Sequence, residues 1–290
     1  MARMGRGSVS HCFPLDERPK SPALATPAPR PKGSSGKRTH DPRQARVPAG
    51  NAAGEDGGLV LALDAGSPVV SVAVGHGGEV LAAGAVPLQR SSTQLLALVA
   101  EVLEAAAALP ADLAGVVALA GPGSFTGLRV GLATALGLFQ GLGVRAQAVP
   151  TLAALAAVSE APPGGLVIAA VDALRGEWSA QAFRAAHVPE PLGEMALVPA
   201  GELLERLAPW AAAHEVTEII AFGVSALRRG ADAAGGRARF QEAPPLAPAA
   251  LRLAAALPPA SWRAASLAAP IYARPPATTA PKPRPGSPPP

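Results

Sequence analysis

Apolar positions between residues 59 and 274 recur with two periodicities, one typical of strands and one typical of helices. Short apolar runs that end at glycine, proline or aspartate predict buried strands. These strands are expected at 59–63, 69–74, 79–86, 116–120, 146–149, 166–171, 178–184, 195–198 and 218–222. Apolar residues spaced three and four apart predict helices at 91–109, 124–142, 152–160 and 202–213.

The order of these elements repeats. Each half opens with strands in a hairpin arrangement and continues with alternating helices and strands, and the second half follows the proline and glycine run at 162–165. This repetition predicts an α/β fold of two lobes on one plan, an N-terminal lobe at 59–163 and a C-terminal lobe at 164–274.

The two ends of the chain differ from this region in composition. Residues 1–58 and 275–290 hold eight prolines each and show no apolar periodicity, so both are expected to be disordered, Pro-rich extensions. The first extension lacks the apolar run of a secretory signal. An alternative is that translation starts near Leu59 or Val60 and that residues 1–58 are a gene-model artefact.

Charge follows the same division. The whole chain has a formal net charge of +4, but residues 1–58 carry +5 and residues 275–290 carry +2. Residues 59–274 carry −3 and contain no lysine. A basic balance is typical of nucleic-acid binding, so that hypothesis is confined to the extensions. The single cysteine, Cys12, excludes a disulfide framework and a multi-cysteine metal site.

The most informative motif is the glycine-rich run at 121–131, between a predicted strand and a predicted helix. Such a loop can direct backbone N–H groups and a helix dipole at an anion. A Walker loop has a lysine after its glycines, and no lysine follows this run. The glycine spacing is also not that of a dinucleotide fingerprint. Phosphate binding therefore remains the weaker interpretation of the loop.

The helix after this loop is rich in small residues. Gly127, Gly131 and Ala135 recur every four residues, and a second strip holds Thr134, Gly137 and Gly141. Each glycine inside a helix costs about 1 kcal/mol relative to alanine, so close packing must offset the cost. The neighbour is the sheet of the same lobe, a helix of a partner, or both. A membrane span is excluded because only fifteen residues separate Arg129 from Arg145, too few to cross a bilayer.

Candidate catalytic groups are sparse. The histidines stand at positions 11, 40, 76, 187 and 214, and no two are four apart, so no metal-binding pair on one helical face is expected. Asp64 and Asp172 each end a predicted first strand just before a turn. A carboxylate there either holds a metal–phosphate complex or caps the turn, and the cap is favoured.

The sequence GPGSFTGLRVG at 121–131 resembles the signature of the TsaB family (YeaZ-type, glycoprotease-like), the dimerisation subunit of bacterial tRNA threonylcarbamoyladenosine biosynthesis. The segments 61–74, 91–103, 172–178 and 270–274 resemble further family motifs in the same order. The resemblance covers about residues 59–274. Ser91 and Ala97 depart from the family, whose first helix often has a histidine and a proline at these places.

The resemblance implies a two-lobed, ribonuclease H-like fold of the actin, acetate and sugar kinase and heat-shock ATPase type. It implies a cytoplasmic, non-catalytic scaffold without cofactor or metal, which forms a heterodimer with a TsaD-like transferase that modifies an adenosine beside the tRNA anticodon. A TsaE-like ATPase is the other expected partner, tRNA is reached indirectly, no membrane is involved, and a homodimer is possible without the partner.

Two sets of site residues follow from the resemblance. The signature loop comprises Gly121, Pro122, Gly123, Ser124, Phe125, Thr126, Gly127 and Arg129. The partner interface is expected on the helices at 91–109 and 124–142, at Leu95, Leu98, Gly127, Leu128, Gly131, Thr134, Ala135 and Leu138. Two alternatives remain open: an ATP-dependent kinase or ATPase that uses Asp64, Asp172 and the 121–127 loop, and a tRNA-binding module that uses the basic extension.

Overall fold

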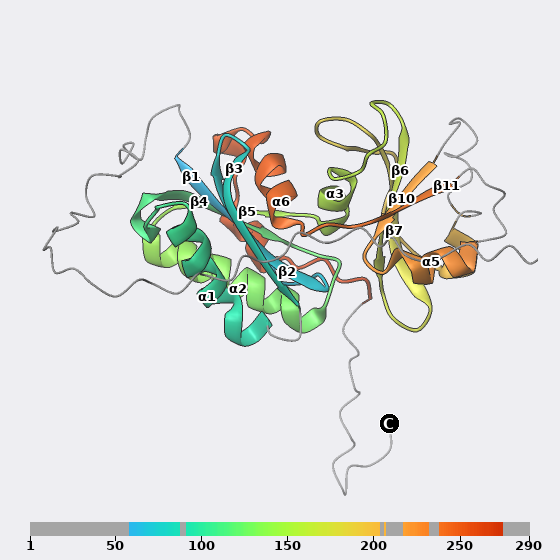
Figure 1. Ribbon diagram of the computed structural model, residues 1–290, viewed down its shortest axis with the longest axis horizontal. Coiled ribbons are helices and arrows are strands. Elements are labelled where there is room, and N and C mark those ends of the chain that lie inside the picture. Colours follow the sequence, from blue (N-terminus) through green and yellow to red (C-terminus); the bar gives the residue numbers. More distant parts are fainter. Residues whose placement is uncertain (1–57, 88–90, 204–205, 207–216, 232–237, 275–290) are drawn as a thin grey trace, which may run out of the picture. The chain divides into compact units, whose positions relative to one another are not determined.

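The computed structural model describes residues 58–87, 91–203, 206, 217–231 and 238–274. Both predicted extensions and most of the predicted helix at 202–213 lie outside these residues. The described part contains two β-sheets, each with helices packed on it (Figure 1).

The first sheet has five strands in the order β3-β2-β1-β4-β5. Their bounds are β1 Leu59–Asp64, β2 Val69–His76, β3 Glu79–Pro87, β4 Leu113–Leu119 and β5 Arg145–Val149. β1 pairs antiparallel with β2 and parallel with β4, which in turn pairs parallel with β5. The helices of this region are α1 Ser91–Ala105, α2 Phe125–Leu142, α3 Thr151–Ala156 and α6 Ala247–Ala255.

The second sheet repeats this plan. Its order is β11-β10-β6-β7-β8, with β9 also paired to β7. The bounds are β6 Leu166–Asp172, β7 Glu177–Arg184, β8 Glu190–Pro191, β9 Ala196–Pro199, β10 Thr217–Ala221 and β11 Ala238–Glu242, with helix α5 at Val224–Ala231. β6 pairs antiparallel with β7 and parallel with β10. The repeated arrangement confirms the predicted two-lobed, ribonuclease H-like α/β fold.

Alternate side chains of β1 point to opposite faces of the first sheet, as the strand geometry requires. Leu61 and Leu63 join the apolar cluster under α1 and α2. Ala62 joins a second cluster that contains residues of α3 and α6 and also Ile220 of the second sheet. The core of the first sheet on this face is therefore continuous with apolar residues of the second sheet.

Helix α2 has recognisable signals at both ends. The Ser124 side chain accepts a hydrogen bond from the backbone N–H of Gly127 at 3.3 Å, which caps the first turn. Gly143 follows the last turn with φ 68°, the left-handed conformation that glycine adopts without strain. These two residues explain why the predicted helix at 124–142 agrees with the structure.

Two predicted helices are shorter than expected. The helix predicted at 91–109 ends at Ala105, and Ala107 adopts a left-handed φ of 52° beyond it. The helix predicted at 152–160 ends at Ala156. The backbone N–H of Glu160 donates to side-chain oxygens of Glu218 and Gln241 instead of to a helical carbonyl, so tertiary partners replace the helical hydrogen bonds.

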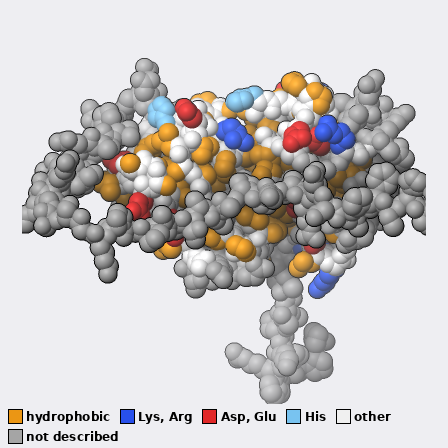
Figure 2. All heavy atoms as spheres, in the orientation of Figure 1, with side chains coloured by type: hydrophobic (Ala, Val, Ile, Leu, Met, Phe, Trp, Pro, Cys, Tyr) orange, Lys and Arg blue, Asp and Glu red, His pale blue; other side chains and the backbone are white. Residues whose placement is uncertain are grey.

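On the face drawn in Figure 2, hydrophobic and uncharged side chains predominate, and acidic and basic ones are scattered between them. Within the described residues, no helix is long and apolar enough to cross a membrane.

The packing of α2 predicts opposite effects for two glycines of that helix. Gly127→Ala is expected to lower the free energy of unfolding by about 1–3 kcal/mol, because its methyl group would collide with the carbonyl oxygen of Ala65. Gly137→Ala is expected to raise it by about 0.5–1 kcal/mol, because alanine favours the helix and nothing lies within 4 Å of the added Cβ. Urea denaturation of the two variants measures both effects, and equal changes would contradict the packing described.

Candidate functional site

The signature loop lies where β4, α2 and the turn after β1 meet. The Ser124 N–H donates to the carbonyl oxygen of Gly66 at 2.8 Å, and the Thr151 N–H donates to that of Gly121 at 2.8 Å. The peptide bond between Gly121 and Pro122 is cis. Loop residues 121–124 are thus hydrogen-bonded to the turn after β1 on one side and to α3 on the other.

Close backbone contacts account for the glycines of this loop. A Cβ on Gly121, which has φ 110°, would collide with the carbonyl oxygen of Ile271. A Cβ on Gly123 would lie 2.7 Å from the carbonyl oxygen of Gly66. Because the glycines are needed for packing, their presence does not require a bound anion.

Asp64 is fully buried at the end of β1. Its Oδ1 accepts hydrogen bonds from the N–H groups of Gly66 and Ser67, both at 3.1 Å, so the carboxylate caps the turn that supports the loop. Burial raises the pKa of Asp64 to about 6, while the hydrogen bonds from the turn act in the opposite direction. This arrangement agrees with the predicted turn cap and leaves the carboxylate without a path to solvent.

Asp172 occupies the matching position at the end of β6 but is exposed. Its Oδ1 accepts a hydrogen bond of 2.7 Å from the N–H of Leu174, so it also caps its turn. Leu174 and Arg175 in this turn have left-handed φ angles of 65° and 60°. Arg274 binds the same turn through an ion pair with Glu177.

The structure buries most of the residues expected at the partner interface. Leu95, Leu98, Leu128 and Ala135 are at most 5% exposed, and Gly127 and Gly131 are buried too. A Cβ built on Gly131 would lie 3.2 Å from the Cβ of Ala65, which directly follows β1, so the neighbour of this strip is the end of that strand. These six residues therefore pack inside the lobe, and only Thr134 and Leu138 of the expected set retain part of their surface.

The other sides of the same two helices carry the exposed residues. Among them are Leu96, Ala97 and Ala100 on α1 and Ala133, Gly137 and Gly141 on α2, a set termed the outer face below. Glu101 and Glu104 of α1 and Gln140 of α2 are exposed as well. Leu96 is 64% exposed, and nothing lies within 4 Å of a Cβ built on Gly137 or Gly141. The helical phase of α1 could have identified Leu96 from the sequence, since its buried positions at 95, 98, 99, 102 and 103 leave 96 and 100 outside.

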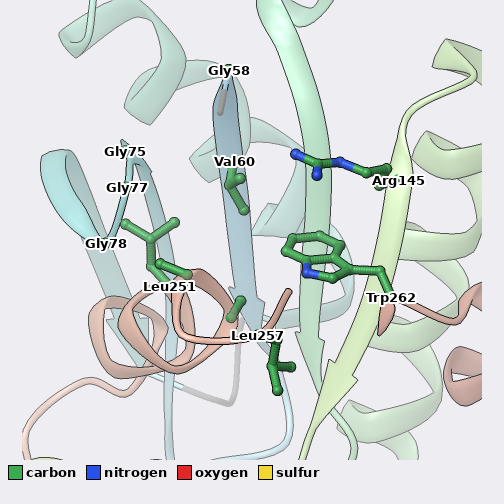
Figure 3. A pocket seen from close by; sticks show the side chains of 11 residues that line it. Gly58, Val60, Gly75, Gly77, Gly78, Arg145, Leu251, Leu257 and Trp262 are labelled. Carbon is green, nitrogen blue, oxygen red and sulfur yellow. The ribbon is translucent and has the colours of Figure 1, made fainter. Parts of the chain in front are cut away.

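A separate cavity of about 270 Å³ lies at the opposite end of β1 from the loop (Figure 3). Its lining includes Val60, Leu251 and Leu257, with the Arg145 guanidinium 5.2 Å from the ring of Trp262. None of the predicted site residues lines it. Among the described residues, no three His, Cys, Asp or Glu side chains form a group that could hold a metal ion.

The buried carboxyl group predicts a pH dependence of stability. The folded pKa of Asp64 lies above its ordinary value of 3.8, so the folded state binds the extra proton between about pH 4 and pH 6. Asp64 therefore contributes its full stabilisation below about pH 4. As the pH rises to about 6 and beyond, the free energy of unfolding falls by about 3 kcal/mol in total. Urea denaturation at pH values across this window should show the decline.

Asp64→Asn should remove this part of the pH dependence, because asparagine keeps the Oδ1 acceptor and does not titrate. The matched control is Asp172→Asn, which changes the exposed carboxylate at the end of β6 and should leave the decline in place. A wild-type protein whose stability rises from pH 4 to pH 6, with Asp64→Asn showing the same rise, would contradict the assignment.

Comparison with known proteins supports the resemblance seen in the motifs. A family model described as TsaD, tRNA N6-adenosine threonylcarbamoyltransferase, matches residues 83–217. The tRNA threonylcarbamoyladenosine biosynthesis protein TsaB of Escherichia coli K12 is 32% identical over 119 residues, which cover 41% of this chain. The match covers 52% of the E. coli protein, so the chain spans about half the length of this curated relative.

Two solved structures from Pseudomonas aeruginosa match over more of the chain. One, described as an uncharacterized protein with similarity to peptidase YeaZ, is 27% identical with a TM-score of 0.63 and covers 75% of this chain and 100% of its own. The other, described as YeaZ, is 27% identical with a TM-score of 0.56. Its match covers 68% of this chain and 90% of its own.

The glycine signature at 121–131, the order of the accompanying motifs and these matches agree with one another. The fold adds the two related sheets that the resemblance predicted. In its signature motif, its fold and these matches, the chain is similar to TsaB and YeaZ proteins.

Proposed function

We propose that this chain is a subunit of the machinery that makes N6-threonylcarbamoyladenosine in tRNA. In this role it is a non-catalytic scaffold that binds a TsaD-like transferase. Support comes from the E. coli relative, named for the biosynthesis of this nucleoside, and from the match to the transferase family model. The chain acts in the cytoplasm, reaches tRNA through the transferase and works beside a TsaE-like ATPase.

The observation that carries this proposal is the outer face of α1 and α2. The two helices contact each other on one face of the first sheet, so their solvent-facing sides form one surface. Gly137 and Gly141 each cost about 1 kcal/mol of helix stability, and none of the described residues lies within 4 Å of a Cβ at either position to explain them. A helix of a partner can approach closely over these glycines while Leu96 is buried beneath it.

This geometry moves the proposed interface around α2 by part of a turn. The strip of Gly127, Gly131 and Ala135 packs against the chain's own sheet, and the outer face carries the partner. Thr134 and Leu138, which are half-buried, lie between the two and remain in the proposed interface. The proposal keeps the two helices that the family resemblance implies, and the burial of their residues indicates which of them a partner could reach.

A kinase or ATPase function is less well supported. Asp64, the carboxylate that such a function would use, is buried and bonded to its own turn. The glycine-rich loop is hydrogen-bonded to that turn as well. The basic extension that the tRNA-binding alternative requires lies outside the described residues, and deletion of residues 1–58 followed by measurement of tRNA affinity of the assembled complex tests it.

Gly137→Leu is the direct test of the outer face. The leucine side chain would occupy the space that a partner helix needs, so the dissociation constant for the TsaD-like protein is expected to rise by about 10- to 100-fold. Isothermal titration calorimetry with the purified transferase measures this, and urea denaturation of the free variant checks that the fold is intact.

The matched control is Ala226→Leu, which places the same side chain on an exposed position of α5. This variant should bind as the wild-type protein does. Wild-type affinity of Gly137→Leu, or loss of binding in both variants, would show that the outer face is not the interface. If the wild-type protein does not bind the transferase at all, the scaffold function itself is wrong.

A further inference from the structure

Arg129 is held in one position by two aromatic side chains at the start of α2. Its Cζ lies 3.8 Å from the centroid of the Phe125 ring, one helical turn earlier. Its Nε donates a hydrogen bond of 3.1 Å to the hydroxyl oxygen of Tyr272, which lies after the short 3-10 helix at Ala264–Ala268. The Phe125 and Tyr272 rings are themselves 5.1 Å apart, so the three side chains form one cluster.

This guanidinium has no acidic partner within the part of the chain that the structure describes. The ion pairs there join Arg184 to Glu190, Arg206 to Glu202, Arg239 to Glu160 and Arg274 to Glu177. Arg129 is exposed, and its two terminal nitrogens form no hydrogen bond with a described residue. A flexible side chain is thus fixed in advance with its charge directed to something outside the described chain, which lowers the entropic cost of binding an anion.

An apolar groove of about 310 Å³ begins beside this cluster. Leu132 and Leu136 of α2 form one wall and Leu267 and Pro270 the other, while Arg129 and Tyr272 stand at one end. The groove is on the flank of α2 nearest residues 264–272, and it shares Ala133 with the outer face. The groove is apolar and has one fixed guanidinium at its end. It therefore matches a ligand that carries an apolar side chain and a carboxylate close together.

We infer that the Phe125–Arg129–Tyr272 cluster and the adjoining groove bind a helix of the transferase partner that carries an Asp or Glu one turn from a large apolar residue. The carboxylate pairs with the terminal nitrogens of Arg129, and the apolar side chain enters the groove between Leu136 and Leu267. This inference rests on the proposed scaffold function and extends its interface from the outer face to the other flank of α2.

A protein partner fits this surface better than RNA does. Binding of unpaired bases uses open aromatic faces, but Arg129 covers one face of Phe125 and holds the hydroxyl of Tyr272. RNA affinity also depends on several basic side chains together, whereas residues 59–274 carry a net charge of −3. One oriented arginine beside an apolar trough is instead typical of a protein interface.

The test measures the affinity of Arg129 variants for the purified TsaD-like transferase. Arg129→Glu is expected to raise the dissociation constant by about 100-fold, because it replaces the pairing by repulsion. Arg129→Lys keeps the charge but loses the planar fork, so a rise of about 3- to 10-fold is expected. The control Arg184→Glu reverses an exposed arginine of β7 and should bind as wild type.

Two further measurements identify the counterpart. The affinity of wild type should fall with added salt more steeply than that of Arg129→Gln, because only wild type forms the ion pair. Among transferase variants in which exposed acidic residues are changed singly to arginine, one should restore binding to Arg129→Glu. Circular dichroism and thermal unfolding of each variant show that the fold is unchanged.

Each outcome decides between the two proposals. If Arg129→Glu binds the transferase like wild type while Gly137→Leu does not, this inference is wrong and the scaffold function stands. If wild type itself does not bind, the scaffold function fails and the inference fails with it. If Arg129→Glu loses affinity for labelled tRNA but keeps its affinity for the transferase, the cluster is an RNA contact and the inference is overturned.

Discussion

The rest of the structure depends on the close approach of α2 to the end of β1. Gly127 has no side chain to separate the helix from the carbonyl group of Ala65, and Gly131 lies just above the Cβ of the same residue. Because the helix is so near, the loop before it can bond directly to the turn after β1, through the N–H of Ser124 and the carbonyl of Gly66. A larger residue at position 127 would separate both contacts at once.

Because α2 lies so close to the end of β1, its different sides have different surroundings. The side with Gly127 and Gly131 packs against the end of β1, and the side with Gly137 and Gly141 has no close neighbour in the part of the chain that the structure describes. The third flank carries Arg129, oriented by Phe125 and by Tyr272 from the end of the described chain. One helix thus carries both the packing of its own lobe and the surface on which the proposed partner lies.

The sequence predicted the elements that have strong local signals. The alternation of strands and helices is visible in the residues themselves, and it predicted the two-lobed fold that the structure has. Helices α5 and α6 and strands β8 and β11 were not predicted. For α6 and β11, prolines and glycines between 230 and 248 obscure the periodicity. Pro248 in the first turn of α6 was in fact a signal for a helix start.

The candidate site was harder to predict, for a physical reason. A glycine that packs against the sheet and a glycine that faces solvent are identical in the sequence, so Gly131 and Gly137 could not be separated by spacing alone. The contact between Arg129 and Tyr272 joins residues 143 positions apart, and no local pattern indicates it. Burial and tertiary contact supply this information, and they moved the expected interface from the inner to the outer side of α2.

Hydrogen–deuterium exchange of the chain with and without the TsaD-like transferase tests the central claim most directly. The account predicts that protection on binding is concentrated in peptides from α1, Ser91–Ala105, and α2, Phe125–Leu142, with further protection around Tyr272. Protection confined to the second sheet, or unchanged exchange in α1 and α2 within a complex of proven mass, would contradict it.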